Sequence, residues 1–425
     1  MALIGNGAKA LTYYAFGPEY NYPGNCYSDS RVIDKLLSQQ REAHTLIARA
    51  EDVLWPATKV ASKVAILAHR SSEVWDPSGA TKWEDQQQHV VAYQADQFGL
   101  YLALAVHGGV PVDFIDEDAL ANATLMAGYT VLFVTQPNVP SASTVTAAAW
   151  VRQGGKLVLS GGAAVADEYN TPLFTFSNLT GAQLSAMPRT VVGSNHENPG
   201  ALNCYAGDVL LQHGGNSTVA RVHAYGANLT VLALQPNATV LATFASGGLP
   251  AVFETAVGAG SVTQFAWQPG LSYLPNASEY VYIPNPQTQL PAVVRELLVG
   301  LTQGSFTPPV RLALHSGSAA AAAAGVVGME TPMSCTPVSA VLPSSSGCVV
   351  TVLNWGGDAE VGAELEMQID LPAAVFGSPP QVGLVFSART GETLSHAPAG
   401  GQTVAVVAQA AYADFVVLVP KQKKG

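Results

Sequence analysis

Runs of apolar residues alternate with amphipathic stretches over residues 62–305. Continuous apolar runs, which are typical of buried parallel strands, occur at 63–68, 112–115, 129–134 and 156–160. Helices are predicted over about 84–107 and from Ser141 or Ser143 to Arg152, and a Gly-Gly pair ends each of them. This alternation predicts a parallel sheet with helices on both faces.

The pattern changes on either side of this core. Residues 205–267 are rich in strands, and a helix over 292–302 closes the region. Residues 306–425 hold alternating β-like segments without a helical pattern, which predicts a small antiparallel β-sandwich. At the start of the chain, a short strand (10–16), a turn-rich loop and a helix (31–53) are predicted, too few elements to form a domain alone.

The composition excludes several classes of protein. Only 12% of residues are charged, against about 25% in typical soluble proteins, and the net charge is -11. No basic stripe is present to neutralise phosphates, so the chain is not expected to bind nucleic acid. The 48% hydrophobic content argues against an acidic disordered chain. No run reaches the ~18 apolar residues that a membrane helix needs.

Six Asn-x-Ser/Thr sequons are present, more than the amino-acid composition predicts. Their asparagines are Asn122, Asn178, Asn216, Asn228, Asn237 and Asn276. They predict a glycoprotein of the secretory pathway, extracellular or in a lysosome- or vacuole-like compartment. The alternative is that half of them stay unmodified. The first residues, MALIGNGAKALTYY, do not read as a signal peptide.

The four cysteines show no metal-ligand spacing, and neither a metal nor a cofactor is expected. Cys335 and Cys348 bracket a Pro/Ser-rich loop, so a local disulfide between them is predicted, with free buried thiols as the alternative.

Motifs for nucleophilic or phosphate chemistry are absent from the sequence. It contains no P-loop, no G-x-G-x-x-G after a strand, no G-x-S-x-G and no cysteine at a strand-to-helix elbow. Asp167 and Glu168 are adjacent acids, whose side chains are expected to point apart and serve structural roles. His69 and Arg70 are interpreted as a polar rim, and His107 as a structural residue that closes a helix, where a positive charge would suit the helix dipole.

The loop after the first predicted strand is the best candidate for ligand contact. Glu19, Tyr20 and Tyr22 are of the types that bind sugars by hydrogen bonds and stacking, and a turn with surface tyrosines is the alternative. No catalytic residue is assigned.

The order of segments resembles the C-terminal two-thirds of family forty-two glycoside hydrolases, the multidomain β-galactosidases. GNGAKALTYYAF is similar to the last strand of their (β/α)₈ barrel, and KVAILAHRSSEVW to the strand that opens their trimerisation domain. YTVLFVTQPNVP with WVRQGGKLVLSGGAAVADEYN, GAGSVTQFAWQPGLSY, and GMETPM with CVVTVLNW are similar to later segments.

This resemblance implies three parts. They are a remnant strand and helix of the barrel (1–56), a flavodoxin-like, class I glutamine amidotransferase-like trimerisation-type domain (57–305), and a C-terminal β-sandwich (306–425). It also implies carbohydrate as partner and a homotrimer. The family's catalytic glutamates lie on earlier barrel strands, and Tyr22 stands where the family has a histidine. We therefore expect a C-terminal portion, from a partial gene model or a fragment, that is inactive alone on β-galactosides or related glycans.

Two other functions remain open from the sequence. One is a non-enzymatic glycan-binding or oligomerisation module. The other is an amidotransferase-like or trehalose-utilisation-like enzyme, which needs a nucleophile that the motifs do not supply.

Overall fold

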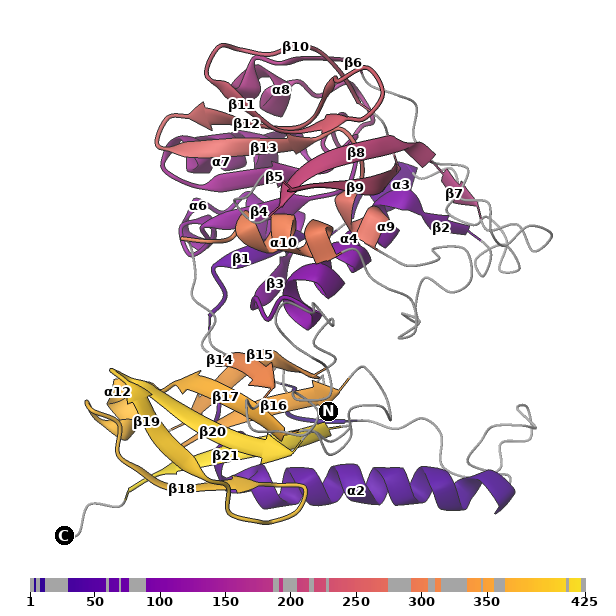
Figure 1. The fold of residues 1–425 in the computed structure, drawn as a ribbon. Helices are drawn as coiled ribbons and strands as arrows, with labels where there is room; N and C mark the ends of the chain where they lie inside the picture. The colour runs from indigo at the N-terminus through magenta and orange to yellow at the C-terminus, as the bar shows by residue number, and fades with distance from the viewer. Residues whose placement is uncertain are drawn as a thin grey trace. The chain divides into compact units, whose positions relative to one another are not determined.

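The chain divides into two compact units. The computed structural model describes residues 4, 8–11, 30–58, 61–68, 70–75, 89–185, 191–193, 205–213, 218–226, 229–273, 292–304, 310–314, 335–344, 347–354, 364–409 and 413–421. Ser62–Thr307 form one unit, called here the parallel-sheet unit. Met1–Ala61 and Pro308–Gly425 together form the other, called the two-sheet unit (Figure 1).

The parallel-sheet unit is built around a nine-stranded sheet of order β3-β1-β4-β5-β13-β12-β11-β8-β9. The strands are β1 (Val64–Leu67), β3 (Val112–Ile115), β4 (Val131–Val134), β5 (Lys156–Leu159), β8 (Tyr205–His213), β9 (Thr218–Tyr225), β11 (Ala238–Phe244), β12 (Pro250–Val257) and β13 (Gly260–Phe265). The pairs β3-β1, β1-β4, β4-β5 and β5-β13 are parallel, and the four remaining pairs are antiparallel. Two-stranded ladders join β2 (His89–Val91) to β7 (Val191–Gly193), and β6 (Gln183–Ser185) to β10 (Thr230–Ala233).

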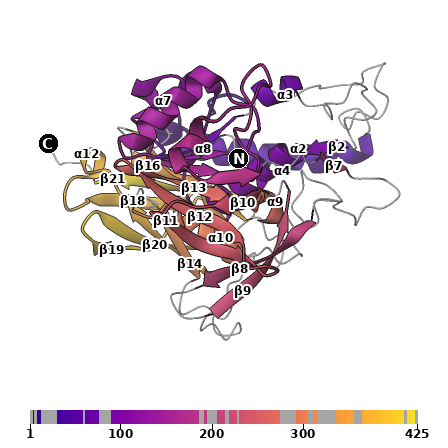
Figure 2. The same cartoon turned by 90° about the horizontal axis from the view of Figure 1, so that it is seen from above.

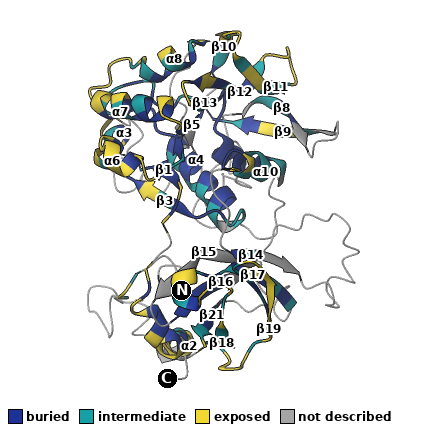
Figure 3. Ribbon diagram, turned by 90° about the vertical axis from the view of Figure 1, so that its left-hand side faces the viewer, coloured by how far each residue is buried: buried dark blue, intermediate teal, exposed yellow. Residues whose placement is uncertain are grey.

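Two groups of helices bury the two faces of this sheet. One group comprises α4 (Ala92–Tyr101), the π-helix η1 (Leu102–Val106), α9 (Pro269–Tyr273) and α10 (Ala292–Gly300). The other comprises α5 (Glu117–Leu120), α6 (Ala123–Met126), α7 (Ser141–Arg152) and α8 (Thr175–Thr180), called here the α5–α8 layer. A further short helix, α3 (Ser71–Trp75), follows β1. All four residues of β1 and of β4 are buried, as expected for strands covered on both faces (Figure 3).

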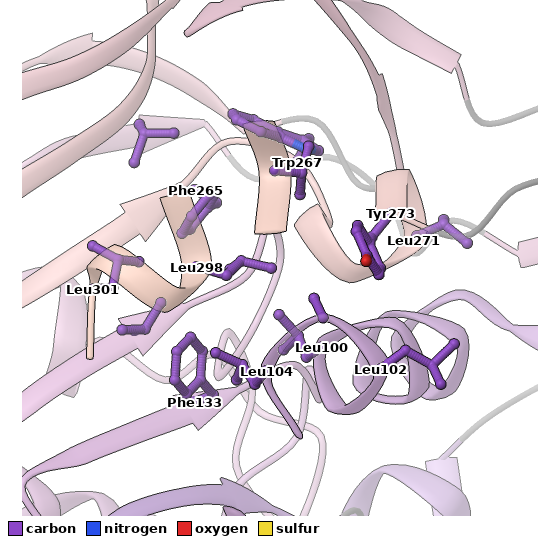
Figure 4. Close-up of a cluster of buried hydrophobic side chains, with 14 of the residues drawn as sticks. Leu100, Leu102, Leu104, Phe133, Phe265, Trp267, Leu271, Tyr273, Leu298 and Leu301 are labelled. Atoms are coloured by element: carbon purple, nitrogen blue, oxygen red, sulfur yellow. The ribbon is translucent and has the colours of Figure 1, made fainter. Parts of the chain in front are cut away.

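On the first face, leucines of α4 and η1 pack against the sheet and against α10. Leu100 and Leu104 are fully buried in one cluster with Phe133, Phe265 and Leu298 (Figure 4). Burying a large aliphatic or aromatic side chain stabilises the fold by about 1.5–3 kcal/mol relative to leaving it exposed. This cluster therefore fixes the position of α4.

Helices α4 and α9 cross with their backbones in contact. A Cβ added at Gly99 would lie 1.9 Å from the carbonyl oxygen of Gly270, and one added at Gly270 would lie 1.9 Å from that of Asp96. Only glycine, which has no Cβ, permits such an approach.

The two-sheet unit holds two four-stranded antiparallel sheets. Their orders are β14-β17-β20-β19 and β15-β16-β21-β18. The strands are β14 (Val310–Leu314), β15 (Cys335–Ser344), β16 (Gly347–Asn354), β17 (Glu364–Asp370), β18 (Val382–Ser387), β19 (His396–Gly400), β20 (Thr403–Gln409) and β21 (Ala413–Pro420), and a short helix, α12 (Ala373–Phe376), follows β17. Side chains from both sheets form one core, with Met367 and Val406 from one and Val350 and Val416 from the other.

The second sheet is also apolar on its outer face, where helix α2 (Ser30–Leu54) covers it. Leu46, Ala50 and Val53 of α2 pack with Phe415 and Val417 of β21. Arg49 donates a 3.0 Å hydrogen bond to the carbonyl oxygen of Ala388, and Glu42 pairs with Arg389 at 3.4 Å. The helix predicted over 31–53 is confirmed, and its partner is this sheet. Its assignment to a barrel remnant (1–56), and the three-domain division, stay predictions.

Three expectations need correction or fall outside the description. The helix expected from residue 84 begins at Ala92, because His89–Val91 pair with β7 as strand β2. The disulfide between Cys335 and Cys348 is not formed, because Cys348 carries a free buried thiol and strand register places Cys335 opposite Asn354 at the far end of the hairpin. The strand expected at 10–16 lies largely outside the described residues.

Within the described part of the chain, no helix has both the length and the apolar character to span a membrane.

Candidate functional site

The carboxyl edge of the parallel strands is the natural place to look for a site in this fold. Strand β1 lies between β3 and β4, so the chain runs from β1 outward to β3 and then crosses back over β1 to β4, and the direction of winding reverses between β1 and β4. Open α/β sheets bind ligands outside the carboxyl ends of the strands at such a switch point. Here the loops that follow β1, β4 and β5 meet.

Hydrogen bonds among buried side chains tie these loops together. The Ser72 hydroxyl accepts from the backbone N–H of Asn138 at 2.8 Å and donates to the Asn138 carbonyl oxygen at 3.2 Å. The Asn138 amide in turn donates to the carbonyl oxygen of Asp167 at 3.0 Å. Gln136 donates to the carbonyl oxygen of Ala68 at 3.2 Å. This edge is therefore held closed by the protein's own groups.

The acids of this edge hold loops and helix ends. Glu117 accepts hydrogen bonds from the backbone and the hydroxyl of Ser71, at 2.9 and 2.6 Å. Glu168 accepts from the backbone N–H of Ser141 at 2.8 Å, at the first residue of α7. A carboxylate at a helix N-terminus is favoured by the helix dipole.

The Asp167 carboxylate instead stabilises the turn that directly follows it in the chain. It accepts from the backbone N–H groups of Tyr169 and Thr171 at 2.9 and 2.8 Å. Hydrogen bonds from the hydroxyl and backbone of Thr171 lower the pKa of Asp167. The structural roles predicted for Asp167 and Glu168 are confirmed.

Asp96 of α4 is a carboxylate that the sequence analysis missed. Its Oδ1 accepts from the backbone N–H of Gly270 at 2.6 Å and of Leu271 at 3.2 Å, so it caps α9. It is fully buried, and its Oδ2 has no hydrogen-bond partner. Burial raises the pKa of Asp96 to about 7, against the opposing effect of hydrogen bonds from Ser160, Leu271 and Gly270. The sequence around Asp96, AYQADQFG, looks like an exposed helix, and only the glycine at position 99 hints at close packing.

His107 follows the π-helix and is neutral rather than cationic. Its Nδ1 and the Tyr273 hydroxyl are 2.8 Å apart. Burial, helped by the charge of Arg295, lowers the pKa of His107 to about 4. The expectation that it places a positive charge at a helix end is therefore wrong, because desolvation outweighs the helix dipole. Burial also raises the pKa of Tyr273 to about 12, so neither group changes its charge near neutral pH.

The remaining predicted site residues are placed as follows. Glu19, Tyr20, Tyr22 and His69 lie outside the described residues, and the sugar contact stays a prediction. Arg70 is exposed and pairs with Asp118 at 3.1 Å. The sequon residues Asn122, Asn178 and Asn237 are exposed, whereas Asn216, Asn228 and Asn276 lie outside the description. Among the described residues no group of three His, Cys, Asp or Glu side chains is arranged to hold a metal ion.

In the two-sheet unit, a surface hollow of about 430 Å³ runs along α2. It is lined by Gln40, Arg41, His44, Thr45 and Ala48. All of these belong to one helix, so the hollow has a single wall and does not bring chemistry from different elements together.

No family model and no curated protein matches the chain. The fold is similar to that of a β-galactosidase from Bacillus circulans sp. alkalophilus, with a TM-score of 0.57 and 15% identity over 96% of this chain and 50% of that one. For a catalytic mutant of Gan42B, a GH42 β-galactosidase from G. stearothermophilus, the TM-score is 0.58 and the identity 13%, over 98% of this chain and 49% of that one. For α-L-fucosidase isoenzyme 2 from Paenibacillus thiaminolyticus, the TM-score is 0.53 and the identity 14%, over 94% of this chain and 54% of that one.

These similarities concern the fold alone, because the identities are low. The chain spans about half the length of each of the three proteins. The structure is thus a mixed α/β fold, with a parallel-core nine-stranded sheet and small antiparallel sheets, like that found in GH42 β-galactosidases and in a fucosidase.

Proposed function

We propose that this chain is the C-terminal, non-catalytic portion of a β-galactosidase-like glycoside hydrolase that acts on β-galactosides or related glycans. The observation that carries the proposal is the fold similarity to two β-galactosidases over 96% and 98% of this chain and about half of each of those proteins. Each of these two matches therefore includes both compact units of this chain. The order of the shared sequence segments supports the same family.

The topology supports a flavodoxin-like assignment of the parallel-sheet unit. Taken in chain order, the five parallel strands are arranged 2-1-3-4-5 across the sheet, the order typical of that fold. The antiparallel strands β12, β11, β8 and β9 extend the sheet beyond this core. In the proposed role, this unit is the assembly domain of a homotrimer.

The chemistry of the carboxyl edge agrees with a non-catalytic role. Retaining glycosidases use two carboxyl groups about 5–5.5 Å apart, one as acid/base and one as nucleophile. Glu117, Asp167 and Glu168 each hold backbone N–H groups of a loop or helix end. Asp96 is buried beneath the edge, where no substrate can reach it.

A hydrolysis assay with a mass measurement tests the proposal. The purified full chain is incubated with nitrophenyl β-galactoside and, because of the fucosidase likeness, with nitrophenyl α-fucoside, while light scattering after size exclusion gives its mass. We expect no turnover above buffer and the mass of a trimer. Turnover of either substrate by the pure chain would overturn the proposal. A monomer that binds galactosides saturably in calorimetry would favour the alternative, a glycan-binding module.

A further inference from the structure

Helices α6, α7 and α8 of the α5–α8 layer carry almost no charge, in contrast to α5, which contributes Glu117 and Asp118. The segments ATLM, SASTVTAAAWVR and TFSNLT of α6, α7 and α8 contain a single charged residue, Arg152. Large apolar side chains are nevertheless exposed there, with Leu125 at 52%, Val145 at 62% and Phe174 at 62% of their surface. Soluble proteins usually cover such helix surfaces with lysine, arginine and acids. The exposed apolar surface of these helices therefore needs a different hydrophilic cover.

Three sequons lie on or beside this layer. Asn122 precedes α6, and Asn178 lies within α8. Asn237 lies in the turn before β11, and Gln235 of the same turn donates a 3.1 Å hydrogen bond to the carbonyl oxygen of Gly181, at the end of α8. Helix α7 contacts the end of α5 and the start of α8 through hydrogen bonds that join Thr146 to Ala121 and Thr144 to Thr175, and Figure 2 shows α7 with α8 beside it. Asn122 therefore lies three residues from Leu125, Asn178 lies four residues from Phe174, and Asn237 lies beside the end of α8.

The side-chain hydrogen bonds of Asn122 and Asn237 are compatible with modification of Nδ2, and the Asn178 side chain is exposed. The Oδ1 of Asn122 caps α6 by accepting from the backbone N–H groups of Thr124 and Leu125, at 3.0 and 3.3 Å. Glycosylation takes place at Nδ2 and leaves this carbonyl oxygen intact, so the cap survives. The Nδ2 of Asn237 donates to the carbonyl oxygen of Ala256 at 3.3 Å, and a secondary amide keeps one N–H for that bond.

We propose that Asn122, Asn178 and Asn237 carry N-linked glycans and that these glycans shield the apolar surface of the α5–α8 layer. In each reaction, Nδ2 forms a bond to C1 of the first sugar of a lipid-linked oligosaccharide. The polyprenyl diphosphate leaves, and the amide loses one proton. The products are a glycosylated asparagine, a polyprenyl diphosphate and a proton. This inference is independent of the proposed glycosidase relationship and requires passage through the secretory pathway.

Occupancy is tested on the full chain secreted from cultured eukaryotic cells behind a cleavable leader. Peptide-N-glycosidase digestion in heavy-oxygen water converts each occupied asparagine to a labelled aspartate, which mass spectrometry locates. We expect label at all three positions. A folded, secreted chain without label at any of them overturns the proposal.

Shielding is tested with Thr124→Ala, Asn178→Gln and Thr239→Ala, which abolish the sequons. Thr124 and Thr239 are exposed, so their loss removes no core packing. Thr124→Ser and Thr239→Ser keep the sequons and serve as matched controls. We expect the triple variant to bind several-fold more apolar dye and to self-associate, with unchanged circular dichroism, while the controls behave as the parent chain. Equal dye binding and equal dispersity in the folded triple variant overturn the shielding role.

Discussion

Two aspartates, one in each compact unit, show how surroundings decide the behaviour of the same carboxyl group. Asp96 of the parallel-sheet unit is fully buried and bonded only to neutral groups, and its pKa is raised to about 7. Asp370 of the two-sheet unit is about one-third exposed, and both of its oxygens accept from the Arg311 guanidinium at 2.9 Å.

Partial burial alone would raise the pKa of Asp370, yet the hydrogen bonds from Arg311 and Thr403 and the charge of Arg311 lower it. The comparison teaches that neutral donors, two backbone N–H groups and the Ser160 hydroxyl, do not compensate a fully buried carboxylate, whereas a bidentate arginine assisted by Thr403 does so at a partly exposed site. The free energy of unfolding should therefore fall with rising pH because of Asp96 and rise with rising pH because of Asp370.

The largest expected effect comes from destroying the burial of Asp96. In Gly270→Ala, the new Cβ would collide with the carbonyl oxygen of Asp96, which forces α9 away from α4. We expect a loss of ~4 kcal/mol in the free energy of unfolding, or no folded protein, because backbone cannot yield as a side chain can.

Urea denaturation measures this loss, and Gly300→Ala is the matched control. Gly300 lies in α10 with no atom within 4 Å of the added Cβ, so alanine should stabilise the helix there by up to about 1 kcal/mol. Equal stability of the two variants would show that the close crossing of α4 and α9 is absent.

The next effect isolates the charge of Asp96. Its folded-state pKa is raised, so its contribution is fully present below about pH 4 and is lost as the pH rises through about 7. The parent chain should lose up to ~4 kcal/mol over that range through this group, at about 1.4 kcal/mol for each pKa unit.

Asp96→Asn keeps Oδ1 as the cap of α9 and cannot ionise. It should therefore be more stable than the parent at pH 8 and close to it at pH 4. Urea titrations of both proteins at the two pH values decide the matter, and an unchanged difference between them would contradict the buried carboxylate.

The smallest effect concerns Asp370. Its pKa is lowered, so its contribution is present above the unfolded-state value of about 4 and is lost as the pH falls below it. Asp370→Asn should cost about 1 kcal/mol or less at pH 7, because the pair is partly exposed, and the cost should vanish in acid.

Thermal melts at pH 7 and pH 3 measure this change. A penalty that grows as the pH falls would reverse the sign and disprove the assignment. The conservative Arg311→Lys change should recover only part of the stability, since lysine cannot form the two parallel hydrogen bonds.

Much of the local structure could be predicted from the sequence. The apolar runs mark β1, β4 and β5, and Ser141 to Arg152 is helical as expected. Strand β3 has the predicted bounds, since Val112–Ile115 follows a Gly-Gly helix stop. These features depend on near neighbours in the chain, which periodicity and turn residues report well.

Features set by distant residues could not be predicted in the same way. The burial of Asp96 depends on Gly270, and the neutrality of His107 depends on burial beside Tyr273 and on Arg295. Strand β2 exists because β7 pairs with it about 100 residues later, a distance over which local propensity carries little information. The structural roles of Asp167 and Glu168 were predictable, because adjacent residues in an extended loop point apart.

The packing of α2 against β16 and β21 has a consequence for biosynthesis. About 290 residues separate the end of α2 from β16, so at about 5–20 residues per second the ribosome needs roughly 15–60 s to deliver the covering sheet. During that interval Leu46, Ala50 and Val53 have no sheet to cover them, while the whole parallel-sheet unit is synthesised. The nascent chain thus presents an amphipathic helix to the cell for tens of seconds, and holdase chaperones that bind apolar segments are expected to engage it there first.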